Sequence, residues 1–213
     1  PTVKRQSGFL LPKLSNSSTL GNSLQIPYYK VISDNKDLTL SPKIFFDDNI
    51  LIQTEYRQKN KNSELITDQS INFNDNSTRS HFFGNFKTST ETSEYQINLE
   101  STSNKNYLKK YEVVSPLIDD NMNLNSFISF EKDFDDSYFS TSFEVFEDLT
   151  KDDTDSYEYI YPNYYFNKQI NSNKPGSLEF STSGYQKKYD TSKYDAVVVN
   201  DIKYRSLQNI SRK

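Results

Sequence analysis

Few side chains in this sequence are of the types that carry out catalysis or hold metal ions. The chain has one histidine, His81, and no cysteine. A zinc site needs several histidine or cysteine ligands, so we interpret His81 as an ordinary strand residue. The acidic clusters 133–136 and 148–155 lack the spaced oxygens and central glycine of a calcium loop and are typical of solvated hairpin loops. We therefore expect no catalytic residue, no metal site and no cofactor.

Two prolines have a more specific consequence. Pro27 interrupts the strand-like run 24–32, and Pro42 interrupts the run 38–46. Proline has no N–H to donate to a β-ladder, so it is found at edges, at bulges or where pairing is weak. One such proline indicates a tolerated edge residue. Two of them in successive strands of one hairpin favour a seam that is kept loose.

The elements that carry these residues have a sequence period of two. Leu38, Leu40 and Ile44 alternate with polar residues, and the same alternation recurs along the chain between turn-forming clusters of Asn, Asp and Ser. This pattern predicts strands whose two faces meet different surroundings. We expect a helical turn within 106–114 and about eleven strands, near 20–32, 37–46, 50–59, 64–73, 79–89, 93–102, 122–132, 137–147, 156–167, 176–187 and 194–206.

The composition excludes several classes of protein. Tyr (16) and Phe (15) are too abundant for a disordered chain. Acidic and basic residues are mixed, the net charge is −4, and no basic stripe is present, so we expect no nucleic-acid partner. No run approaches the ~20 apolar residues of a membrane-spanning helix, but most of the predicted strands are near the ~9–11 residues that cross a bilayer as tilted strands.

The placement of the aromatic residues favours a barrel. Adjacent aromatic residues stand near strand ends, as at 28–29, 45–46, 82–83 and 164–166, which is typical of the aromatic girdles of membrane barrels. The connections are mostly short and lack the long crossovers of a sandwich. We predict an all-β fold, an antiparallel transmembrane β-barrel of which this chain supplies about eleven strands. On periodicity alone, a secreted all-β domain is an equal alternative.

Several motifs resemble those of the LPS-assembly proteins, the LptD/OstA family. The segment 4–12, KRQSGFLLP, resembles the stretch that leads into the barrel of this family, and 26–29, IPYY, resembles its PYY strand. The segment 37–42, DLTLSP, resembles its D-x-T-x-TP strand, and 55–57, EYR, resembles its E-[FY]-R strand. Further along, 103–111 resembles a family connection, with Asn104 in place of an aspartate, and 159–164 resembles an aromatic-proline strand. The similarity is specific over 4–57 and looser beyond.

The resemblance implies a non-enzymatic component of the outer membrane of a Gram-negative bacterium. Residues 1–19 would lead in from an upstream periplasmic domain, and residues 20–213 would form the first part of a large barrel. The implied partners are lipopolysaccharide, outer-membrane lipid, an LptE-type lipoprotein that plugs the lumen, and a periplasmic LPS-transport bridge protein that contacts the upstream domain. In this family lipid A leaves through a seam beside the first strand, and the resemblance places Pro27, Pro42, Tyr28 and Tyr29 at this lateral gate.

Two other hypotheses stay open at this point. One is another outer-membrane barrel, such as a porin or solute channel, and the other is a secreted all-β adhesion or structural domain. The chain stops at Lys213 without the aromatic last residue that is usual in complete barrels of this kind. We therefore expect a truncated barrel that does not close alone, because open strand edges are not tolerated in lipid.

Overall fold

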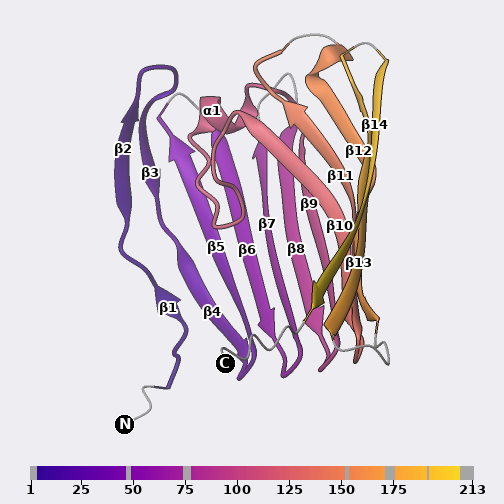
Figure 1. Cartoon of the computed structure of the whole chain (residues 1–213). Helices are drawn as coiled ribbons and strands as arrows, with labels where there is room; N and C mark the ends of the chain where they lie inside the picture. The colour runs from indigo at the N-terminus through magenta and orange to yellow at the C-terminus, as the bar shows by residue number, and fades with distance from the viewer. Residues whose placement is uncertain are drawn as a thin grey trace, which may run out of the picture.

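The computed structural model describes residues 4–46, 49–73, 78–151, 154–170, 176–190 and 192–206. They form one antiparallel 14-stranded sheet that curves across its width (Figure 1). In chain order the elements are β1 (Gly8–Phe9), β2 (Lys13–Ser17), β3 (Gly21–Gln25), β4 (Tyr28–Ser33), β5 (Lys36–Phe45), β6 (Ile50–Lys59), β7 (Ser63–Phe73), β8 (Arg79–Ser89), β9 (Ser93–Thr102), α1 (Tyr107–Tyr111), β10 (Asn123–Asp133), β11 (Ser137–Asp148), η1 (Thr154–Ser156), β12 (Tyr157–Ile170), β13 (Gly176–Tyr189) and β14 (Lys193–Ser206).

Strands that follow one another in the chain are neighbours in the sheet from β4 to β14. The first edge is more irregular. Strands β1 and β2 lie in line along it, with β1 paired to β4 and β2 paired to β3. Strands β3 and β4 in turn form one line against β5, interrupted at residues 26–27. We call residues 8–17, which contain β1 and β2, the edge segment.

The strand registers sort apolar and polar side chains onto opposite faces. Ile128 of β10 lies opposite Ile97 of β9 and Phe143 of β11, whereas the next residue, Ser129, lies opposite Gln96 and Ser142. Successive side chains of a strand point to opposite faces, so the first set marks an apolar face and the second a polar face. Large side chains of the apolar face that stay exposed include Leu40, Ile44, Ile52, Ile71, Phe82, Leu99, Ile128, Phe143, Val198 and Ile202.

The buried core lies on the polar face rather than between two sheets. The connection 103–122, which contains α1, lies across this face (Figure 1). Tyr107 and Leu108 of α1 are completely buried, as is Phe83 of β8, and Phe45 and Leu51 complete the contact from β5 and β6. Neither helix of the described chain has the length and apolarity needed to cross a membrane.

Each of the eleven predicted strands is present, with bounds within three residues of those expected, and the predicted helical turn is α1. The predicted strand 20–32 is split into β3 and β4, because Pro27 stands at the interruption. Strands β1 and β2 were not predicted, since the edge segment contains Pro12 and little alternation; they lie within 1–19, which the sequence assigned to a lead-in segment. The division into two domains stays a prediction.

The sheet has two free edges. Within the described residues, no pairing joins β14 to the edge segment. An all-β antiparallel fold was predicted, and it is confirmed in the form of an open, curved sheet that is consistent with part of a barrel.

A substitution at Gly184 tests how closely β13 and β14 approach each other. A Cβ atom added at Gly184 would lie 2.5 Å from the carbonyl oxygen of Val197 and 2.9 Å from Cε1 of Tyr164. We expect Gly184→Ala to lower the free energy of unfolding by about 1–3 kcal/mol, as overpacking does, in denaturant titrations of the folded full-length protein. Gly8→Ala is the control, because nothing lies within 4 Å of its added Cβ. An equal loss in both variants would contradict the predicted close approach.

Candidate functional site

Pro27 weakens the pairing between the edge segment and the strand behind it. Its carbonyl oxygen accepts a hydrogen bond from the Leu10 N–H, with an N···O distance of 2.9 Å. In an antiparallel ladder two residues that are bonded in this way exchange both N–H···O bonds. The return bond, from residue 27 to the carbonyl of Leu10, cannot form because proline has no N–H. One hydrogen bond is therefore missing at this interface.

Pro42 has the same effect one interface further into the sheet. The Ile26 N–H donates to the Pro42 carbonyl oxygen at 3.1 Å, and the return bond to Ile26 is again excluded by the proline. The missing donor points toward β3 and β4, so the pairing of Pro42 with Ile52 of β6 loses nothing. The two prolines thus remove one bond on each side of the strand line formed by β3 and β4.

The two tyrosines after Pro27 point to different faces. Tyr28 lies opposite Leu40 on the apolar face, and its ring contacts Phe9 edge to face with ring centroids 5.0 Å apart. Tyr29 lies opposite Thr39 on the polar face. All four predicted gate candidates, Pro27, Tyr28, Tyr29 and Pro42, therefore lie on the β3–β5 part of the first edge. Their role as a gate stays a prediction.

An ion-pair cluster joins three of the motifs that the sequence analysis described separately. The Asp37 carboxylate, only 5% exposed, accepts hydrogen bonds from Arg5 Nη1 at 2.6 Å and Arg57 Nε at 2.8 Å. Glu55 Oε1 lies 3.2 Å from the same Arg57 nitrogen. Arg5 also donates to the main-chain carbonyl of Asp34. The chain just before the edge segment is thereby attached to β5 and β6, a contact that the sequence analysis did not predict.

A buried polar network attaches α1 to the sheet. The Tyr107 hydroxyl lies 2.6 Å from Ser70 Oγ, which lies 2.7 Å from His81 Nδ1. Asp68 Oδ1 is 3.4 Å from His81 Nε2, but without the alignment of a hydrogen bond. Burial raises the pKa of Tyr107 to about 12, so its hydroxyl stays protonated at neutral pH. His81 is a strand residue, as predicted, but the sequence did not reveal its buried partners.

The residue types of this network, serine, histidine and aspartate, are those of a hydrolase triad. Their setting does not suit that chemistry. The Ser70 side chain is 1% exposed and lies beneath Tyr107, whose hydroxyl is bonded to its oxygen. A substrate carbonyl cannot reach a hydroxyl that is covered in this way. The network therefore acts as an anchor for α1.

Three further hydrogen bonds hold the rest of the connection against the polar face. The Tyr111 hydroxyl donates to Asn72 Oδ1 at 2.8 Å, and Lys43 Nζ donates to the Tyr111 carbonyl oxygen at 3.2 Å. Gln53 Nε2 donates to the Val114 carbonyl oxygen at 2.9 Å. Strands β5, β6 and β7 are thus bonded to one connection as well as to each other.

The first acidic cluster, 133–136, spans the β10–β11 turn, as the sequence predicted. The second, 148–155, runs from the end of β11 into η1, and its residues 152–153 lie outside the described residues. In the loop before β10, the N–H groups of Met122 and Asn123 donate to Asp120, which lowers the pKa of that carboxyl. No group of three or more potential ligands among the described residues could hold a metal ion.

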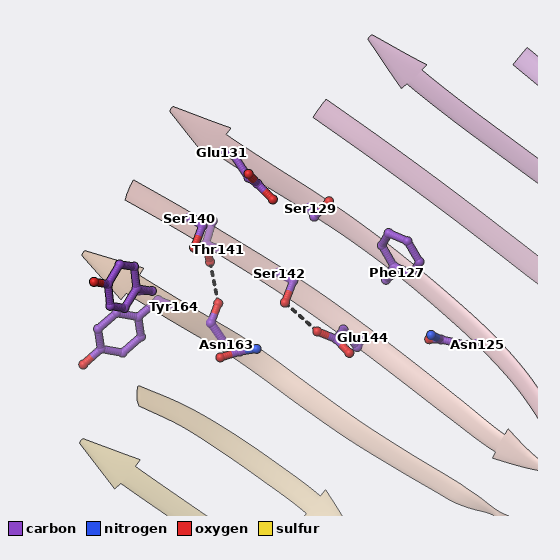
Figure 2. Close-up of a pocket in the computed structure, with 11 residues that line it drawn as sticks. Asn125, Phe127, Ser129, Glu131, Ser140, Thr141, Ser142, Glu144, Asn163 and Tyr164 are labelled. Atoms are coloured by element: carbon purple, nitrogen blue, oxygen red, sulfur yellow. Dashed lines mark hydrogen bonds between the residues drawn. The ribbon is translucent and has the colours of Figure 1, made fainter. Parts of the chain in front are cut away.

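A groove of about 340 Å³ lies farther along the sheet, on β10, β11 and β12 (Figure 2). Most of its lining comes from polar-face positions of three strands, with Thr141 and Tyr164 between them. The sequence cannot distinguish these positions from others on the polar face, so the groove was not predicted. The lining residues are Asn125, Phe127, Ser129, Glu131, Ser140, Thr141, Ser142, Glu144, Asn163, Tyr164 and Tyr165.

Replacement of Tyr107 tests the anchor. We expect Tyr107→Ala to release the connection 103–122, because it removes a fully buried ring and the hydrogen bond to Ser70, at a cost of about 3–5 kcal/mol. Limited proteolysis and hydrogen exchange of the full-length protein would show faster cleavage and exchange within 103–122. Tyr95→Ala removes a tyrosine that is 46% exposed and should leave the connection protected. Unchanged protection in Tyr107→Ala would contradict the anchor.

Comparison with known proteins shows similarity over part of the chain. No family model matches the chain. The chain is 44% identical over 61 residues to the LPS-assembly protein LptD of Ectopseudomonas mendocina, a match that covers 29% of this chain and 6% of that protein. It is 30% identical over 131 residues to LptD of Psychrobacter arcticus, covering 57% of this chain and 14% of that protein. LptD of Pseudomonas aeruginosa is 38% identical over 63 residues, with coverages of 30% and 7%.

These matches span only a small part, 6–14%, of the length of the relatives. They agree with the family that the sequence motifs indicated, without assigning the region of the relatives to which the chain corresponds. Over the matched residues, the chain is similar to LptD-like LPS-assembly proteins.

Proposed function

We propose that this chain forms the first part of an outer-membrane barrel that delivers lipopolysaccharide to the surface of a Gram-negative bacterium. The observation that carries the proposal is a single sheet with one apolar and one polar face, in a chain similar to LPS-assembly proteins. In lipid every backbone N–H and C=O must be bonded within the protein, so a sheet is stable there only as a closed barrel. The two free edges would pair with strands elsewhere in the full-length protein.

The two faces suit the two parts of the proposed cargo. The apolar face would meet outer-membrane lipid, and the polar face would line a lumen that contains water. Lipopolysaccharide is itself divided, because its acyl chains prefer lipid and its sugars prefer water. A carrier that keeps both parts in suitable surroundings must let the acyl chains leave sideways, between two strands. The proposed activity is therefore transport, without a catalytic step.

The proposed exit lies beside β3 and β4. Pro27 and Pro42 each remove one N–H donor next to this strand line, and β1 pairs with β4 through only two residues, Gly8 and Phe9, continued by the single bond from Leu10 to Pro27. Each lost bond lowers the stability of an interface by about 0.5–1.5 kcal/mol. Less work is then needed to separate the strands here than elsewhere in the sheet. The separating partner is the edge segment or the last strand of the full barrel.

The remaining partners belong to the same proposal. An LptE-type lipoprotein would occupy the lumen and contact the polar face. A periplasmic bridge protein would deliver lipopolysaccharide to a domain upstream of residues 1–19. Both are proposed by analogy with LptD, to which the chain is similar over part of its length.

The prolines give a direct test of the exit. The double variant Pro27→Ala and Pro42→Ala restores one N–H donor on each side of the β3–β4 line. Whichever side opens, the closed seam should be stabilised by about 0.5–1.5 kcal/mol, a factor of roughly 2–13 in the opening equilibrium. We expect slower appearance of newly made lipopolysaccharide at the cell surface in pulse-labelled cells. Pro116→Ala is the control, because Pro116 lies in the connection after α1 and outside every strand. Export at the normal rate in the double variant would rule out these prolines as seam elements.

A pair of neighbouring lysine substitutions tests whether the apolar face of the sheet lies in a membrane. Ile97→Lys places a charge on the apolar face near the middle of β9, whereas Gln96→Lys places it on the polar face. At the centre of a bilayer the first should cost about 2–4 kcal/mol, and the second should cost little. Denaturant unfolding of the full-length protein in lipid vesicles measures both. Equal tolerance of the two charges would favour a secreted all-β domain over a membrane barrel.

A further inference from the structure

The groove on β10, β11 and β12 is built where the strands are irregular. The register shifts between Ser142 and Glu144 in the β11–β12 pair, and between Ile160 and Asn163 in the β12–β13 pair. Such irregularities redirect side chains and are common next to binding sites. The volume of about 340 Å³ is at the lower end of the range for small-molecule pockets. Its floor is the polar face of the sheet (Figure 2).

Short hydroxyl and amide side chains supply both donors and acceptors to this groove. Ser129 and Ser140 contribute hydroxyl groups from β10 and β11, and Asn163 contributes an amide from β12. Asn125 lines the same groove, and its Oδ1 atom is buried without a hydrogen-bond partner. A buried oxygen without a partner is costly. A rotation of the Asn125 amide toward the groove would let a ligand hydroxyl satisfy it.

Aromatic rings and carboxylates complete the lining. Phe127 and Tyr165 each present a ring, which can pack against the C–H groups of a flat ligand. Glu131 and Glu144 present carboxylates, which form strong hydrogen bonds with hydroxyl donors. The lining contains neither lysine nor arginine. An anionic ligand would therefore meet two like charges and no opposite one.

We propose that this groove binds an uncharged sugar ring. Aromatic packing, carboxylates, hydroxyls and an amide oxygen without a partner together match the alternating C–H and O–H groups of a sugar. The absence of a cation from the lining disfavours phosphorylated or acidic sugars. That the sugar belongs to the glycan of lipopolysaccharide in transit rests on the proposed function. A free neutral oligosaccharide has the same chemistry.

The test uses the full-length protein in detergent and saturation-transfer NMR. The probes are isomaltotriose, which is neutral, and glucose 6-phosphate, which is anionic. We expect saturation transfer to isomaltotriose and at least tenfold weaker transfer to glucose 6-phosphate. Phe127→Ala combined with Tyr165→Ala should abolish transfer to isomaltotriose. If this variant does not fold, Glu131→Lys combined with Glu144→Lys tests the same groove, because it should reverse the preference toward glucose 6-phosphate.

The matched control makes the same charge change elsewhere on the polar face. Glu64→Lys combined with Glu179→Lys, both on the polar face by register, should leave the preference for isomaltotriose intact. No transfer to isomaltotriose in the unmodified protein would overturn the proposal, and so would an unchanged preference in the Glu131 and Glu144 variant.

Competition with lipopolysaccharide identifies the source of the sugar. Lipopolysaccharide that carries a neutral glycan should displace isomaltotriose, whereas lipopolysaccharide truncated before its neutral sugars should not. Displacement by neither form would overturn the assignment to lipopolysaccharide. Normal surface delivery of lipopolysaccharide without sugar binding would contradict the sugar-binding groove but not the proposed function. Sugar binding in a protein whose depletion leaves surface delivery unchanged would contradict the proposed function but not the groove.

Discussion

Backbone hydrogen bonding between neighbouring strands is the constraint on which the rest of this molecule depends. From β4 to β14, each strand pairs antiparallel with the next in one sheet. Because side chains alternate along each strand, the register of this ladder fixes the apolar and polar faces together, and a slip by one residue would exchange them. The same ladder sets the requirements for a membrane, where each free edge must find a partner.

The ladder is reinforced in one place and weakened in the next. The connection 103–122 is bonded to β5, β6 and β7 through Lys43, Gln53, Ser70 and Asn72. One interface away, the prolines remove donors on both sides of β3 and β4. Arg5 keeps the chain before the edge segment attached to Asp37. Separation of strands beside β3 and β4 would therefore leave the rest of the sheet, and this attachment, in place.

The sequence was sufficient to predict the strands from β3 to β14, because alternation and turn residues are local signals. It also indicated the interruption at Pro27, since a missing donor is a property of one residue. It could not predict that Arg5, Asp37 and Arg57 meet, or that Ser70 and His81 lie beneath Tyr107, because these contacts depend on register and on the path of a long connection. The groove was missed for a related reason. Alternation assigns each residue to one face of the sheet, but it does not show where that face is hollowed.

The most direct test of the two-faced sheet is the accessibility of single cysteines along β11, in a chain that has no cysteine of its own. Ser140 and Ser142 belong to the polar face, and Thr141 and Phe143 to the apolar face. In intact outer membranes, cysteines at 140 and 142 should react with a water-soluble maleimide, and cysteines at 141 and 143 should react only with a reagent dissolved in lipid. Equal reaction of all four positions with the water-soluble reagent would contradict the account.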